Sequence, residues 1–258
     1  MYRPTQADLD EVLKAHDIWS CDPSKGVKAN LSYTDLSFLY LTNRDLRDID
    51  FTGAVLRKTN FSDSNLSEAV FKKANLMGAV FNNAKLDDAD FSEAELPYAE
   101  FINANLERAT FYKTNLTGAT LKKAFMLDAN LEHAQLREAD LTQCYLGYAN
   151  LRQASLNNAD LTDADIKCAN LENADLRFAM LRFIKNTVPM YQFYIKSRLC
   201  IALKEILVIG EFTRSWDYWL VNFKEELKGG VFSKEDIDKA YDIIKYYHKL
   251  IQKGESSC

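Results

Sequence analysis

Residues 51–70 read FTGAV LRKTN FSDSN LSEAV, four five-residue units that each begin with a large apolar residue. The spacing continues in both directions, because from Leu31 to Leu181 a Leu, Phe, Ile or Met recurs at every fifth position, 31 times in all. We call this large apolar residue the centre of its repeat. The position two residues before each centre holds a small residue, with Leu39, Arg44 and Ile49 as the only exceptions. A period of five fits neither an amphipathic helix nor a strand, so it predicts a repetitive structure of another kind.

These units resemble the repeats of the pentapeptide-repeat family, whose pattern is Ala-(Asp/Asn)-Leu-x-x. Residues 129–133 (ANLEH) and 159–163 (ADLTD) match it position by position, and the resemblance covers about residues 27–183. It implies an all-β solenoid, a right-handed quadrilateral β-helix in which four pentapeptides form one coil. The central and the small residue of each repeat then point inward, and the repeats make about eight coils.

The phenylalanines follow a longer period within this pattern. Residues 20 positions apart lie above one another if a coil has four pentapeptides, and stacked coils lie about 4.8 Å apart. We therefore expect two stacks of rings on opposite inner faces, one of Phe51, Phe71, Phe91 and Phe111 and one of Phe61, Phe81 and Phe101.

The chain divides into three predicted parts. Residues 1–26 form an N-terminal helical cap, in which Thr5 and Asp8 have the spacing of a capping box at the start of a helix over residues 5–20. Residues 27–183 form the β-helix. Residues 184–258 form a C-terminal extension, with strands at 191–195 and 199–209 that extend the wall of the rod, followed by two helices beginning at Ser215 and Ser233.

Aromatic residues in the extension permit two interpretations. The two helices either fold back as a C-terminal cap, or they present aromatic side chains to a second copy or another partner. The residues of this candidate homodimer or partner contact are Trp216, Trp219, Tyr241 and Tyr247. In the N-terminal cap, His16 is expected to pack or cap rather than to react.

Composition argues against several functional classes. The formal charge of −5 and a pI near 5.4 disfavour direct nucleic-acid binding, which needs a basic face. The five cysteines are odd in number and scattered, so we expect reduced thiols in a cytoplasmic protein, and no apolar run suits a signal peptide or a membrane span. The three histidines lie in separate regions, and no phosphate loop, HExxH or CxxC occurs. We expect no enzyme activity, cofactor or metal site.

The outward positions suggest two candidate surfaces for a protein partner. One is an acidic coil consisting of Asp87, Asp88, Asp90, Glu93, Glu95 and Glu100, although Lys73, Lys113 and Arg108 lie 20 residues away from members of it. The other is a pair of aromatic residues, Phe125 and Tyr145, which are 20 apart and replace the usual Asn or Asp before the centre.

Three functional hypotheses follow. In the first, the protein docks on a partner protein, such as a DNA-handling or defence enzyme, and inhibits or modulates it. In the second, which the resemblance suggests, it mimics DNA and protects or inhibits DNA gyrase. In the third, it is a passive scaffold. The resemblance also implies a bacterial or phage origin.

Overall fold

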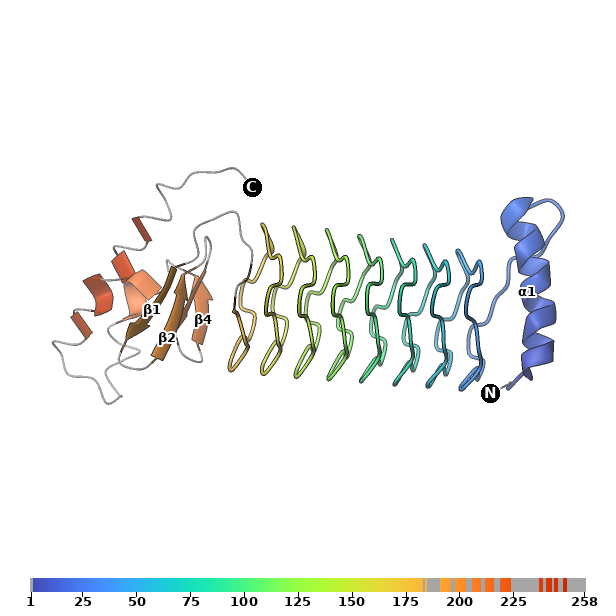
Figure 1. The fold of residues 1–258 in the computed structure, drawn as a ribbon, viewed down its shortest axis with the longest axis horizontal. Coiled ribbons are helices and arrows are strands. Elements are labelled where there is room, and N and C mark those ends of the chain that lie inside the picture. Colours follow the sequence, from blue (N-terminus) through green and yellow to red (C-terminus); the bar gives the residue numbers. More distant parts are fainter. Residues whose placement is uncertain are drawn as a thin grey trace.

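The structure is a computed structural model that describes residues 2–182 and 184, four strands between 191 and 215, and helical residues 219–223, 237–238, 240–242, 244–245 and 248–249. Figure 1 shows a rod of stacked coils with the helix α1 (Gln6–Cys21) at one end and a small sheet beyond the other. Within the described residues, no helix combines the length and apolar character needed to cross a membrane.

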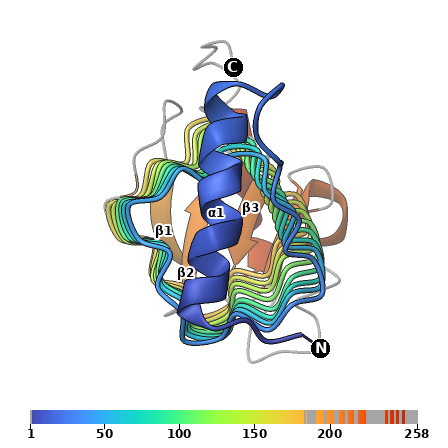
Figure 2. The ribbon, with the colours of Figure 1, turned by 90° about the vertical axis from the view of Figure 1, so that its right-hand side faces the viewer.

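Each coil of the rod pairs with the next through parallel bridges between residues 20 apart. These bridges run at every fifth residue from Asn30 with Asp50 to Asp160 with Met180. From Leu31 to Leu161, the N–H of each central residue donates to the carbonyl 19 positions further on, as Leu31 does to Asp50 at 2.8 Å. Figure 2, which looks along the rod, shows the coils superimposed on one another. The predicted coil of four pentapeptides is therefore confirmed.

The corners of the coil are tight turns that depend on left-handed backbone. From Tyr33 to Phe178, the residue two positions after each centre has φ between 54° and 67°. At most of these corners the next N–H closes the turn onto the central carbonyl, as Ala54 does onto Phe51 at 3.0 Å. Nearly all of these corner residues carry a side chain. Because L-residues disfavour this conformation by about 1–2 kcal/mol, the pairing between coils must offset a strain that recurs at every corner.

Phenylalanine rings fill the core in the two predicted stacks. Neighbouring rings within each stack lie 4.7–5.0 Å apart with nearly parallel planes. Rings of the two stacks meet edge to face, with centroids 5.7–6.1 Å apart. All seven side chains are fully buried. Both stacking predictions are confirmed, and the mutual edge-to-face contact locks the stacks together.

Hydroxyl groups replace alanine at some inward positions without leaving an unpaired polar atom. The Thr59 hydroxyl donates to the Leu36 carbonyl at 2.8 Å, and the Thr114 hydroxyl donates to the Phe91 carbonyl at 2.6 Å. Such bonds remove most of the cost of burying a hydroxyl group. The small position therefore selects for size rather than for polarity.

Helix α1 covers the first coil through polar contacts as well as apolar ones. Thr5 and Asp8 form the predicted capping box, and Leu9 and Leu13 are buried. Arg44 donates to Asp10 at 2.6 Å. Arg44 occupies a position where later coils carry a small residue. It is accommodated because its side chain reaches the helix instead of a neighbouring coil.

His16 joins α1 to the start of the rod as a packing residue, as predicted. Its side chain is fully buried, stacks on Trp19 with centroids 5.3 Å apart, and its Nδ1 accepts the N–H of Ala29 at 3.3 Å. Burial lowers the pKa of His16 below its usual value, and this effect outweighs the opposing influence of the Asp45 and Asp17 carboxylates. The folded protein therefore favours the neutral form of this imidazole.

The N-terminal cap should lose stability in mild acid. Below about pH 6.5, His16 becomes protonated in the unfolded chain more readily than in the folded chain. The unfolded state then binds more protons, so the free energy of unfolding decreases as the pH is lowered. Hydrogen exchange of the α1 amides at pH 7.5 and 5.5 should show faster opening at the lower pH. In His16→Gln the change in opening between the two pH values should be smaller. An equal change in both proteins would contradict this role of His16.

The C-terminal extension contains a separate sheet of four antiparallel strands in the order β1–β2–β3–β4. They are β1 (Tyr191–Ile195), β2 (Arg198–Ala202), β3 (Ile206–Ile209) and β4 (Phe212–Ser215). The strand at 191–195 is confirmed, but 199–209 is two strands, and β4 was not predicted. Ser215 ends β4, so the prediction that it begins a helix is wrong. The described ladders join these strands only to one another, so they do not continue the pairing of the wall.

Helical residues after the sheet pack their aromatic side chains on one another. Trp219 has 1% of its surface exposed and meets Phe223 edge to face, and Phe223 stacks on Tyr241 with centroids 6.0 Å apart. The Tyr241 hydroxyl donates to the Leu220 carbonyl at 2.7 Å. Trp219 and Tyr241 thus belong to the internal packing of the extension, whereas Trp216 and Tyr247 lie outside the described residues.

The prediction of five reduced cysteines is wrong at Cys168, which is disulfide-bonded. Cys21 is free and exposed, and Cys144 is free and buried, where desolvation raises the pKa of its thiol. Sequence spacing could not reveal the disulfide because the fold, not the distance along the chain, brings two thiols together. The cysteine argument for a cytoplasmic location therefore does not hold.

Candidate binding surface

The acidic coil does not form one continuous acidic patch. Its six carboxylates are distributed over three successive pentapeptides, residues 86–100, and therefore do not lie on one wall of the rod. Asp88 is held by Arg108 through two bonds of 2.7 and 2.8 Å, and Lys72 lies 3.0 Å from Asp90. Lys73 lies 3.7 Å from Glu93. Basic residues of neighbouring coils thus neutralise half of the predicted acidic surface.

The remaining three acidic residues accept hydrogen bonds from neighbouring coils. Ser67 donates to Asp87 at 2.7 Å, Asn115 donates to Glu95 at 2.7 Å, and Asn82 donates to Glu100 at 2.9 Å. Two of these donors lie 20 residues away, at the same position of an adjacent coil, and Asn82 lies 18 residues away. These carboxylates therefore take part in the contacts between coils.

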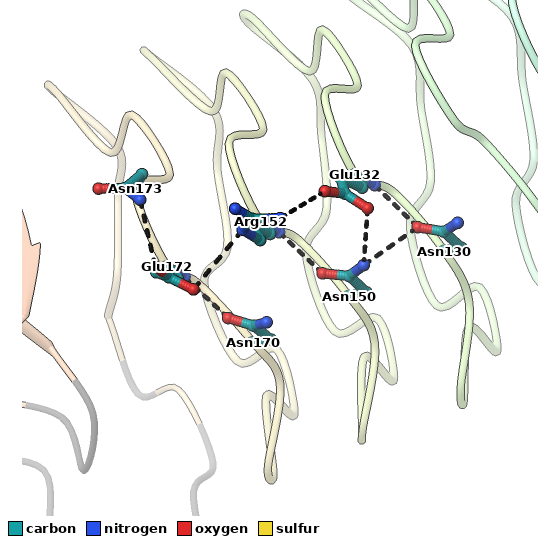
Figure 3. Close-up of polar contacts among 7 residues, drawn as sticks. All are labelled: Asn130, Glu132, Asn150, Arg152, Asn170, Glu172 and Asn173. Atoms are coloured by element: carbon teal, nitrogen blue, oxygen red, sulfur yellow. Dashed lines mark hydrogen bonds and ion pairs between the residues drawn. The ribbon is translucent and has the colours of Figure 1, made fainter.

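Further along the rod, the wall that carries Asp90 holds a ladder of polar side chains that satisfy one another (Figure 3). Arg152 lies between two glutamates, 3.1 Å from Glu132 and 3.6 Å from Glu172. Beside them Asn150 donates to Asn130 at 3.3 Å. Arg152 therefore bridges three successive coils, and this wall offers a partner few charged groups that lack a protein contact.

Phe125 and Tyr145 lie together on an outer wall, as the sequence predicts. Their rings are stacked with centroids 4.8 Å apart and planes within 1° of parallel. Both remain accessible, with 47% of Phe125 and 44% of Tyr145 exposed. Phe125 and Tyr145 are the bridged residues, and in the chain each lies between two residues whose side chains point inward. Their own side chains therefore point outward, and neither ring can reach the core.

Two further exposed apolar side chains extend this pair. Leu127 lies two residues beyond Phe125, and Tyr148 lies three residues beyond Tyr145 at a left-handed corner. Gly147 leaves room for Leu127, since a methyl group there would lie 3.1 Å from Leu127 Cδ1. We refer to Phe125, Leu127, Tyr145 and Tyr148 as the aromatic patch. Sequence reasoning missed Leu127 and Tyr148, although their large apolar side chains at outward positions were a usable signal.

A shallow hollow of about 530 Å³ borders the aromatic patch. Its walls come from the patch itself and from the preceding corners of four coils. We call this hollow the groove; its lining residues are Asn103, Lys123, Phe125, Gln143, Cys144, Tyr145, Asp163 and Asp165. In the described part of the chain, no group of three or more His, Cys, Asp or Glu residues is placed to hold a metal ion.

Family models match most of the rod. One, a pentapeptide repeat region, matches residues 44–121. Another, for pentapeptide repeats in eight copies, matches residues 111–147 and 144–179. The chain belongs to the pentapeptide-repeat family. The matches cover the coils and stop before the C-terminal extension, so this part of the pentapeptide-repeat protein is not explained by the family pattern.

Several solved structures of pentapeptide-repeat proteins are similar to the chain. HetL, involved in heterocyst differentiation regulation in the cyanobacterium Nostoc sp. strain PCC 7120, is 25% identical over 69% of this chain and 93% of its own, with a TM-score of 0.38. QnrB1, a plasmid-mediated fluoroquinolone resistance protein, is 20% identical over 62% and 90%, with a TM-score of 0.36. A protein of the Arabidopsis thaliana thylakoid lumen is 34% identical over 42% and 68%, with a TM-score of 0.29. No curated protein matches the chain.

Proposed function

We propose that this protein works by binding a partner protein through the aromatic patch and that binding modulates the partner's activity. The observation that carries the proposal is the stacked, exposed pair of Phe125 and Tyr145. Aromatic side chains of this kind contribute most at interface hot spots, because they bury a large area at a small entropic cost. Leu127 and Tyr148 enlarge the same surface.

The acidic coil gives less support to DNA mimicry. A mimic needs rows of free negative charge along the rod, yet Arg108, Lys72 and Lys73 contact three of the six carboxylates. A passive scaffold also fits less well, since it gives no reason for an exposed apolar patch on an otherwise polar wall. We therefore favour the hypothesis of a partner-binding modulator.

A capture experiment with a matched variant tests this function. The wild-type chain, Phe125→Ser/Tyr145→Ser and the control Tyr98→Ser would be immobilised, and the retained proteins from a lysate of the source organism identified by mass spectrometry. Tyr98 is a suitable control because it is 64% exposed and belongs to another pentapeptide of the coil.

The expected result is one protein retained by wild type and by Tyr98→Ser and lost from the double variant. Calorimetry with that protein purified should then show affinity reduced at least about tenfold by the double substitution. Equal retention by all three chains would contradict the proposal, as would a purified partner that binds the double variant as tightly as wild type.

A further inference from the structure

The charged groups of the groove lack the ion pairs that several charged residues elsewhere in the rod make. Arg152, Arg108 and Lys72 each contact a carboxylate of a neighbouring coil. In contrast, within the described residues, neither Asp163 nor Asp165 forms an ion pair. Asp165 accepts one backbone bond, from the Lys167 N–H at 3.1 Å, which leaves its second oxygen available. Two carboxylates thus lie beside an exposed aromatic ring with no cation between them.

The stacking of the two rings leaves one face of Tyr145 open in the direction of the rod axis. Phe125 covers one face of Tyr145, and the ring planes are parallel, so the other face of Tyr145 is turned toward the next coil. That coil carries Asp165 at the equivalent position, bridged to Tyr145. Because aspartate is much shorter than tyrosine, a third planar group can continue the stack at the level of Asp163 and Asp165.

The other end of the groove has the opposite charge. Lys123 precedes Phe125 by two positions. The coil that carries Asp163 and Asp165 lies two coils beyond the coil of Lys123, a separation of about 10 Å along the rod. Among the residues that the structure describes, Lys123 makes no ion pair. A cationic group is therefore attracted to the carboxylate end and repelled from the lysine end.

We propose that the groove seats an arginine side chain of a partner protein, with its guanidinium stacked on Tyr145 and bonded to Asp163 and Asp165. A guanidinium is planar, so it can extend the ring stack, and its donors form a fork that suits carboxylates. An ammonium group is compact and more strongly hydrated, so it stacks less well. This inference rests on the proposed function, because the patch beside the groove supplies the apolar contact for the rest of the partner.

A model compound tests the arginine seat without knowledge of the partner. The ¹⁵N-labelled full chain would be titrated with N-acetyl-arginine methylamide and followed by amide chemical shifts. N-acetyl-citrulline methylamide, which has nearly the same shape without the charge, and N-acetyl-lysine methylamide serve as matched probes. We expect saturable shifts at Gln143, Tyr145, Asp163 and Asp165 with the arginine compound, affinity at least threefold weaker with lysine, and no saturable shift with citrulline.

Charge removal provides the second arm. Asp163→Asn/Asp165→Asn should lose at least tenfold in affinity for the arginine compound. The control Asp50→Asn/Asp140→Asn also removes two charges, from aspartates that each accept a backbone N–H as Asp165 does, and it should bind like wild type. No localised shift with arginine, equal binding of lysine or citrulline, or unchanged binding by the groove variant would each overturn the proposal.

The outcomes separate this inference from the proposed function. A partner that is captured equally by wild type and by Asp163→Asn/Asp165→Asn, but not by the aromatic-patch variant, overturns the arginine seat and supports the proposed function. If the arginine compound binds saturably but the partner binds the aromatic-patch variant as tightly as wild type, the result supports the arginine seat and contradicts the proposed function.

Discussion

Replacing Phe91 with alanine should lower the free energy of unfolding by about 3–5 kcal/mol, because it opens a cavity at the centre of the rod. The ring is fully buried and lies in the middle of its stack, 4.7 Å from Phe71 and 5.0 Å from Phe111. It also meets Phe81 and Phe101 edge to face. Backbone pairing fixes the coils on both sides, so the walls cannot collapse to fill the space.

Urea unfolding followed by circular dichroism measures this effect. Phe125→Ala is the matched control, since it removes the same ring from an exposed position and should cost less than about 1.5 kcal/mol, the value of a stacked pair. If Phe91→Ala and Phe125→Ala were equally stable, the interlocked phenylalanine core would be incorrect.

Replacing Gly26 with alanine should destabilise the N-terminal cap by about 3 kcal/mol or more. A Cβ at residue 26 would lie 2.0 Å from the backbone nitrogen of Trp19, 2.4 Å from its Cα and 2.6 Å from the Ala15 carbonyl oxygen. These are backbone atoms of α1, so no side chain can rotate away. The helix must move, and the bond from the Val27 N–H to the Ala15 carbonyl is lost.

Hydrogen exchange of the α1 amides is the appropriate measurement, because the loss is confined to the cap. Gly78→Ala is the matched control. It lies at a left-handed corner where a Cβ would be 3.4 Å from Lys58 Cγ, and most equivalent corners already carry a side chain, so the cost should be about 1 kcal/mol. Unchanged α1 protection in Gly26→Ala would show that the helix does not pack against this glycine.

The candidate surface was only partly accessible to sequence reasoning. Phe125 and Tyr145 could be placed together because their separation equals the length of one coil. The acidic coil was a weaker prediction, since the linear sequence counts charges without showing that Arg108 and Lys72 neutralise them. The groove could not be predicted, because its lining residues come from four adjacent coils and its shape depends on side-chain size rather than on a motif.

The repeat pattern alone is enough to predict the rod. A five-residue period that holds from Leu31 to Leu181 specifies which side chains face inward, and the 20-residue spacing of the phenylalanines specifies which ones stack. Nearest-neighbour packing between coils makes such a structure local, so a local pattern suffices. Three features become visible only in the folded chain: the antiparallel sheet of the extension, the disulfide at Cys168 and the carboxylates without an ion pair beside Tyr145. Each of these depends on residues that meet only after folding, with no period to relate them.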